Sequence, residues 1–246
     1  MTSARSLHTA TALTNGTVLI AGGFDSTMAT LASAEIYDPI TGLFTATGAM
    51  SAGRVAAEAA RLRNGQVLMV GGQDASGNAM TSVDLYDPIT GTFSPTGALI
   101  TPRLNPTVTV LKDGRVLVAG GYEGTSHGTP LATAEIYKPN SGRFVATDSM
   151  DVPRRNATAS RLRDGTVLIA GGYNGEAVNS PELFNPQSGT FSPAAAMSTP
   201  RRYPSATLLP GGAVLMAGGF ATAYGDPLRS SERFLPSSWR SSKSTG

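Results

Sequence analysis

The feature that most constrains the fold of this chain is a short phrase that occurs five times along it. Each copy has a turn sequence such as Asn-Gly or Asp-Gly, an apolar run such as Val-Leu-Ile-Ala, and a pair of glycines. The glycine pairs, whose spacing is 47 to 51 residues, are Gly22 and Gly23, Gly71 and Gly72, Gly120 and Gly121, Gly171 and Gly172, and Gly218 and Gly219. A period of this length is typical of proteins in which each repeat is one supersecondary element.

Two further motifs keep the register of the glycine pairs. One is an acidic residue two positions before an aromatic residue, with Pro two positions after the aromatic residue. The aromatic residue lies 12 to 16 residues after the second glycine. The other is an arginine 18 residues before the second glycine: Arg5, Arg54, Arg103, Arg154 and Arg201. Five units therefore fill a single predicted domain over residues 1–246. Their predicted bounds are about 1–49, 50–98, 99–149, 150–196 and 197–240, with a tail over 241–246.

Each unit predicts four short strands, named A to D here. Segments such as 107–111 alternate hydroxyl and apolar residues and predict strand A. The Asn-Gly or Asp-Gly step predicts a two-residue hairpin turn with positive φ at both residues, and the apolar run predicts strand B, buried on both faces. The acidic and aromatic motif predicts strand C. Strand D begins at an aromatic residue, which is Phe44, Phe93, Phe144, Phe191 or, in the last unit, Trp239.

These elements predict an all-β protein, because no segment has a helical period with capping residues. A four-stranded sheet of about 49 residues cannot bury both of its faces alone, whereas similar sheets packed face to face around an axis can. We therefore expect a β-propeller of five four-stranded antiparallel blades. We further expect a closed monomeric ring in which the first and fifth blades pack together, with a blade-sharing oligomer as the alternative. The Ser-rich residues 237–246 predict a poor last strand and a tail.

The motifs resemble kelch repeats, of the galactose-oxidase central-domain-like superfamily. The resemblance lies in the Gly-Gly pair after a β-branched run, the Tyr that follows 14 residues later in Tyr37, and the aromatic residue seven positions beyond it in Phe44. It covers nearly the whole chain and differs where the family's usual Trp is Phe in four units, which keeps an aromatic ring but loses the indole N–H. The resemblance implies binding through the loops of one face.

Residues that recur in every unit are expected to serve packing and closure. The glycine pairs predict positions of unusual φ or close backbone approach, since no helix follows them that could form a phosphate site. The arginine and the acidic residue of each unit supply one cation and one anion per blade. Pairing of these charges is one interpretation. A ring of ligand-binding arginines is the other.

The loops between strands B and C and between strands D and A lie on one face, here called the upper face, and the B–C loops vary in length. Variable loops on a rigid scaffold are where specificity is expected. Aromatic residues beside arginines can stack sugars, hold carboxylates or bind an acidic peptide. The predicted binding residues are Phe24, Tyr122, His127, Tyr173 and Phe220 of the B–C loops, and Arg54, Arg103, Arg154 and Arg201 of the D–A loops. The D–A loops also contain Arg155, Arg202 and Tyr203.

Composition narrows the classes of function. Because the chain has no Cys, thiolate chemistry and the copper radical site of galactose oxidases are excluded. The chain has only two His residues, His8 and His127, and we therefore predict no catalytic residue, metal or cofactor. A net charge of +2 gives little support for nucleic acid, and no apolar run is long enough for a membrane span. The sequence does not indicate a cellular compartment for the protein. The expected partner is a protein segment or a glycan.

Two other functions remain as alternatives to a binding or scaffold module. One is a carbohydrate-active enzyme of lyase or epimerase type, with an Arg and an acidic residue at the mouth of the channel. An enzyme is expected to bury a carboxylate of perturbed pKa in a pocket, whereas a binder is expected to show a broad surface of aromatic and Arg side chains. The other is an excised or engineered array of blades, because the sequence starts and stops at unit boundaries.

Overall fold

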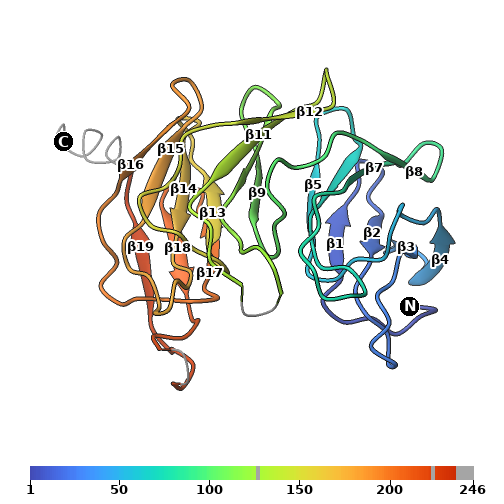
Figure 1. Ribbon diagram of the computed structural model, residues 1–246, viewed down its shortest axis with the longest axis horizontal. Coiled ribbons are helices and arrows are strands. Elements are labelled where there is room, and N and C mark those ends of the chain that lie inside the picture. Colours follow the sequence, from blue (N-terminus) through green and yellow to red (C-terminus); the bar gives the residue numbers. More distant parts are fainter. Residues whose placement is uncertain (126–127, 223–224, 237–246) are drawn as a thin grey trace.

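The computed structural model describes residues 1–125, 128–222 and 225–236, which form five antiparallel sheets arranged as a five-bladed β-propeller (Figure 1). The first blade contains β1 (Thr9–Ala12), β2 (Val18–Ala21), β3 (Ala34–Asp38) and β4 (Leu43–Thr47). The second contains β5 (Glu58–Arg61), β6 (Val67–Val70), β7 (Val83–Asp87) and β8 (Thr92–Pro95). The third contains β9 (Thr107–Val110), β10 (Val116–Ala119), β11 (Ala134–Lys138) and β12 (Arg143–Ala146).

The fourth blade contains β13 (Thr158–Arg161), β14 (Val167–Ala170), β15 (Glu182–Asn185) and β16 (Thr190–Pro193). The fifth contains β17 (Ser205–Leu208), β18 (Val214–Ala217) and β19 (Ser231–Phe234). Each strand pairs with the next in sequence, so every blade is a meander. The predicted last strand and Trp239 lie outside the described residues. None of the described residues lies in a helix, and hence none belongs to an apolar helix that could cross a membrane.

The A–B turns differ from the two-residue turns that we expected. In the first blade Ala12 pairs with Val18, and the Leu13 N–H donates to the Thr17 carbonyl (2.8 Å), which leaves a three-residue loop. Such a loop needs only one residue of positive φ, and Gly16 supplies it with φ of 88°. The Asn15 side chain instead accepts a hydrogen bond from the Thr17 N–H (3.1 Å). The prediction of positive φ at both turn residues was therefore wrong.

The core lies between blades, as the buried B strands predicted. Leu68 and Val70 of β6 belong to one cluster with Val116 and Val118 of β10, and all four side chains are fully buried. Similar clusters fill the junctions between the first and second, third and fourth, and fourth and fifth blades. The predicted aromatic residue of strand D stacks on that of strand C, with ring centres 4.8 to 4.9 Å apart, in the pairs Tyr37–Phe44, Tyr86–Phe93, Tyr137–Phe144 and Phe184–Phe191.

The expected packing of the fifth blade on the first is not found among the described residues. The two blades lie at opposite ends of the view in Figure 1, and no core cluster of described residues joins them. Leu215 of β18 is half-buried, whereas its equivalents Leu68 and Leu117 are fully buried. The turn between successive blades is set locally by the side chains between them, so five repeats need not complete a circle.

Candidate functional site

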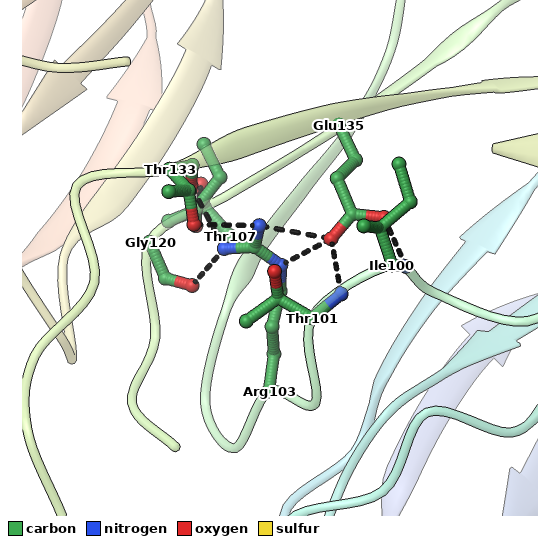
Figure 2. Close-up of polar contacts among 8 residues, drawn as sticks. Ile100, Thr101, Arg103, Thr107, Gly120, Thr133 and Glu135 are labelled. Atoms are coloured by element: carbon green, nitrogen blue, oxygen red, sulfur yellow. Dashed lines mark hydrogen bonds and ion pairs between the residues drawn. The ribbon is translucent and has the colours of Figure 1, made fainter. Parts of the chain in front are cut away.

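The repeated arginine of each unit is a buried clamp inside its own blade, as Figure 2 shows for the third blade. Arg103 donates from Nη1 to the carbonyls of Gly120 (2.9 Å) and Thr133 (2.8 Å), which lie at the two sides of the B–C loop. Its Nε and Nη2 donate to Glu135 Oε1 at 3.0 and 2.9 Å. The Glu135 carboxylate also accepts from the Ile100 N–H (2.7 Å). One guanidinium therefore ties the D–A loop to strands B and C.

The same ion pair occurs in all five blades. The shortest nitrogen-to-oxygen distances are 3.0 Å for Arg5–Glu35, 2.6 Å for Arg54–Asp84, 2.9 Å for Arg103–Glu135, 2.6 Å for Arg154–Glu182 and 3.0 Å for Arg201–Glu232. The guanidinium groups are buried, so the geometry supports the pairing interpretation for Arg54, Arg103, Arg154 and Arg201. Their Nη atoms donate to carbonyl, hydroxyl and carboxylate oxygens of their own blades, and the upper surface does not present the guanidinium groups to a ligand.

Burial and hydrogen bonding act against each other in these pairs. Desolvation lowers the pKa values of Arg54, Arg103 and Arg154, and the facing carboxylates oppose this effect. Burial alone would raise the pKa of Glu35, but hydrogen bonds from the Thr2 and Ser3 N–H groups and from Arg5 lower it to about 2. The ion pair of the first blade therefore persists far below neutral pH.

The backbone of the same arginines joins one blade to the next. In the second and third blades, the Gly72 N–H donates to the Arg103 carbonyl (3.1 Å). A Cβ on Gly22 would lie 2.6 Å from the Arg54 carbonyl oxygen, and one on Gly171 would lie 2.6 Å from that of Arg201. Both glycines have positive φ, so the predicted structural role of the glycine pairs has two parts, conformation and close approach.

The residues directly after the arginines lie at the level of the upper face, where Val55 and Leu104 are buried and Ser6, Arg155 and Arg202 reach the surface. Each pairs through its backbone with the residue after the glycine pair, as Arg155 does with Tyr173 and Arg202 with Phe220. The first three blades have Ser6, Val55 and Leu104 at the position after the arginine, whereas the last two have arginines. The fourth and fifth blades therefore add two guanidinium groups to the upper face.

The side chains at this level form a ladder of alternating aromatic and guanidinium groups. The Arg155 guanidinium carbon lies 4.7 Å from the ring centre of Tyr122 and 5.2 Å from that of Tyr173. The Arg202 guanidinium carbon lies 5.6 Å from the Tyr173 centre and 5.2 Å from the Phe220 centre. We call Tyr122, Arg155, Tyr173, Arg202 and Phe220 the aromatic-arginine ladder. These distances are those of cation–π contacts.

The structure thus brings together three of the five predicted aromatic and His residues. Tyr122 is buried at 6% exposure and forms the base of the ladder, whereas Tyr173 and Phe220 are half-buried. Phe24 lies in the first blade and pairs through its backbone with Ser6 and Thr30, away from the ladder. His127 lies outside the described residues.

A cavity of about 350 Å³ opens where the D–A loops of all five blades meet. It is lined by the residue two positions after each repeated arginine, and these five residues all have positive φ between 48° and 55°. Neighbouring loops are linked by hydrogen bonds, from the Ala56 N–H to the Leu7 carbonyl (3.0 Å) and from Asn105 Nδ2 to Asn156 Oδ1 (3.0 Å). The five lining residues are Leu7, Ala56, Asn105, Asn156 and Tyr203.

Glu58 supplies the acidic side chain of this cavity. Water reaches its carboxylate through the mouth, yet desolvation by the surrounding walls raises the pKa of Glu58 to about 7. The other four blades have Thr9, Thr107, Thr158 or Ser205 at the same register position of strand A. Each of those hydroxyls donates to a strand B carbonyl, at 3.2 to 3.4 Å.

The opposite, lower face also has hollows, of about 510 and 440 Å³, between the turns of adjacent blades. Their arginines link blades. Arg63 donates to the Lys112 carbonyl, and Arg115 Nη2 donates to the Pro186 carbonyl (2.7 Å). No group of three potential His, Cys, Asp or Glu metal ligands exists within the described part of the chain.

Comparisons with known proteins agree with this architecture. The Kelch motif family model matches residues 5–51 and 154–198. The solved structure described as "Structure of YjhT" is similar with a TM-score of 0.75 and 16% sequence identity, covering 92% of this chain and 80% of that chain, a likeness that shows the fold. The search of curated proteins found no match.

The repeated sheets, the clamps and the interblade cores define a β-propeller. The Kelch motif matches fall on the first and fourth units and support a kelch-repeat propeller, as the sequence resemblance predicted. Propellers of this kind generally act as binding or scaffold modules.

Two features of the site were not predicted from the sequence. The D–A loop residues Arg155 and Arg202 were noted, but the repeated arginines beside them were chosen as binding residues because they lie in loops of the upper face near aromatic residues. The informative signal was the change from Ser, Val and Leu to Arg at the next position. Glu58 was missed as well, although a Glu at a position otherwise held by Thr or Ser breaks the repeat.

Proposed function

We propose that the upper face of this propeller binds a protein segment that carries carboxylate side chains, and that the aromatic-arginine ladder is the contact surface. The observation that carries the proposal is the run of cation–π contacts from Tyr122 to Phe220 across three blades. Stacking fixes the planes of the guanidinium groups, and an oriented guanidinium can hold a carboxylate with two parallel hydrogen bonds.

Neighbouring loops support the proposal. A hollow of about 560 Å³ lies between the B–C loops of the fourth and fifth blades, and Gly175, Ala177 and Thr222 are among its lining residues. Ala177 pairs through its backbone with Tyr173, so this hollow adjoins the ladder. An extended segment that crosses the ladder would therefore find small side chains and the carboxylate of Glu176 beside it, where its own uncharged or basic side chains have room.

A peptide array and a glycan array, both probed with the purified chain, test the proposal. We expect acidic peptides to bind, and we expect Arg155→Gln and Arg202→Gln each to weaken binding by about tenfold or more. Lys138→Gln is the control, because it removes one positive charge from an exposed side chain on the lower face. Equal losses of binding in all three variants would show that the net charge of the protein, and not the ladder, determines binding. Binding to glycans alone would show that the ligand is a sugar and not a protein segment.

A carbohydrate-active enzyme is the second candidate, and Glu58 is the observation that favours it. A carboxyl group with a pKa of about 7 is suited to proton transfer near neutral pH. The test is incubation of the wild type and Glu58→Gln with a library of sugars, followed by product detection by mass spectrometry. Turnover that is lost in Glu58→Gln would favour the enzyme, and the same sugars recovered unchanged would favour the binding module.

A further inference from the structure

The side chain of Glu58 breaks the repeat at a position where the other blades have a structural hydroxyl. Thr107 Oγ1 donates to the Ala119 carbonyl (3.2 Å), and Thr158 Oγ1 donates to the Ala170 carbonyl (3.3 Å). An ionised carboxylate has no proton to donate, so Glu58 cannot perform this function at the corresponding strand B carbonyl. The second blade therefore lacks a link that the others have, and it gains a negative charge at the channel mouth.

This charge has no partner among the described residues. None of the ion pairs between described side chains includes Glu58. The strands that pack against β5, which are β1 (Thr9–Ala12), β6 (Val67–Val70) and β9 (Thr107–Val110), contain no ionisable side chain. The adjoining D–A loops carry the repeated arginines, each of which is paired with a carboxylate of its own blade. Their other ionisable side chains are those of His8, Asp148, Asp151, Arg155, Arg202 and Tyr203, and Arg61 lies at the far end of β5.

Desolvating a carboxylate without a counter-charge costs free energy, and such costs are concentrated at functional sites. The Glu58 side chain is exposed at the mouth of the cavity, while the walls around it partly desolvate the carboxyl and raise its pKa to about 7. A cation in the cavity would remove this cost, because an opposite charge within a few ångströms favours the ionised form. The cavity, with its volume of about 350 Å³, has room for a small ligand group.

The other polar groups of the cavity indicate which kind of cation fits. Asn105, Asn156 and Tyr203 offer amide and phenol oxygen atoms, which accept hydrogen bonds. An ammonium group has three N–H donors and can bind one carboxylate and two such oxygens at once. A metal ion is disfavoured, since the described residues provide no cluster of three potential metal ligands.

We propose that the cavity at the channel mouth is a binding site for an organic ammonium group, such as a lysine side chain or a small amine, with Glu58 as its counter-ion. The site adjoins the aromatic-arginine ladder, because the Arg202 guanidinium carbon lies 5.7 Å from the ring centre of Tyr203, but it does not depend on the function proposed for that ladder. Binding couples to ionisation of Glu58, so affinity increases as the pH rises through 7.

The test uses n-butylammonium as the probe and follows the side-chain carboxyl carbon of Glu58 by NMR. We expect saturable binding at pH 8, about 30-fold weaker binding at pH 5.5 because little of the carboxyl is ionised there, and a lower pKa of Glu58 in the complex. Glu58→Gln keeps the shape of the side chain and should lose binding by more than tenfold. Butan-1-ol and butyrate are the neutral and anionic controls and should not bind.

Two variants distinguish binding at Glu58 from a loss of folding and from binding at the ladder. Glu58→Thr restores the hydroxyl of the other blades, so it should fold and still fail to bind the probe. The variant Arg155→Gln alters the ladder through Tyr122 and Tyr173, which do not line the cavity, and should bind n-butylammonium as the wild type does. Equal binding by the wild type and Glu58→Gln, equal binding of butan-1-ol, or no binding to the wild type at pH 8 would each overturn the proposal.

Discussion

The backbone carbonyl of Arg103 accepts a hydrogen bond from the Gly72 N–H of the preceding blade, at 3.1 Å. The side chain of the same arginine points into its own blade and binds Glu135 at 2.9 Å. One residue therefore both closes its own blade and attaches it to the one before. This double use explains why arginine and glycine recur together in every unit.

Replacing Arg103 with Met should lower the free energy of unfolding by about 3–5 kcal/mol, because Glu135 would stay buried without its counter-charge. Urea denaturation measures this loss. The double variant Arg103→Met/Glu135→Leu should recover much of it, since no charge is then left in the core. A single variant as stable as the wild type would show that the clamp does not hold the blade together.

Gly171→Val should be more damaging than Gly218→Val. Both glycines have similar positive φ, 67° and 65°, so the conformational cost of about 1–3 kcal/mol is shared. A Cβ on Gly171 would also lie 2.6 Å from the Arg201 carbonyl oxygen, whereas the nearest described atom to one on Gly218 is the Leu228 carbonyl oxygen at 3.8 Å. Thermal unfolding of the two variants measures the difference. Equal losses would indicate that another blade packs on the fifth.

The contribution of Glu58 to the stability of the wild type should fall as the pH rises from 4.5 to 7. Its pKa in the folded protein is about 7, against an ordinary value of 4.5, so the folded state retains a proton that the unfolded chain has released. Glu58→Gln carries no titrating group and should be more stable than the wild type at pH 8 but not at pH 4. Urea denaturation at both pH values checks this. The same stability difference at both would contradict the raised pKa.

The lowered pKa of Glu35 predicts the opposite pH dependence of stability at acid pH. Because its pKa is lowered from 4.5 to about 2 in the folded protein, its contribution of about 3 kcal/mol is present above pH 4.5 and is lost as the pH falls towards 2. Glu35→Gln should therefore be less stable than the wild type at pH 7 and nearly equal to it at pH 2. A constant difference between the two proteins across this range would argue against the lowered pKa.

The sequence predicted the fold because the evidence for it is repeated and local. The apolar runs of the second, third and fourth blades are fully buried strands, and each Phe of strand D stacks as the aromatic spacing indicated. Closure was not predictable in the same way, since it depends on small rotations that add up over five blades. Leu215 of the fifth blade is half-buried, because among the described residues no first-blade side chain packs on it.

The candidate site was predicted less well, for a physical reason. Repetition marks residues that every blade needs, so Arg54 and Arg103 are clamps even though their residue type suits binding. The surface depends on positions that differ between blades, such as Arg155 where Leu104 and Val55 are the equivalents. Stacking of Arg155 between the rings of two different blades is a tertiary contact, and no local pattern encodes it.

The adjacent residues Arg154 and Arg155 allow a side-by-side test of whether repeated residues hold the scaffold while variable residues form the binding surface. We predict that Arg154→Gln lowers the free energy of unfolding by about 3–5 kcal/mol, because it leaves Glu182 buried and unpaired. We predict that Arg155→Gln costs about 1–2 kcal/mol, the value of its ring contacts, and weakens binding of an acidic peptide by about tenfold or more. Urea denaturation of the two variants would contradict this division of roles if Arg155→Gln were the more destabilised protein, or if Arg154→Gln were as stable as the wild type.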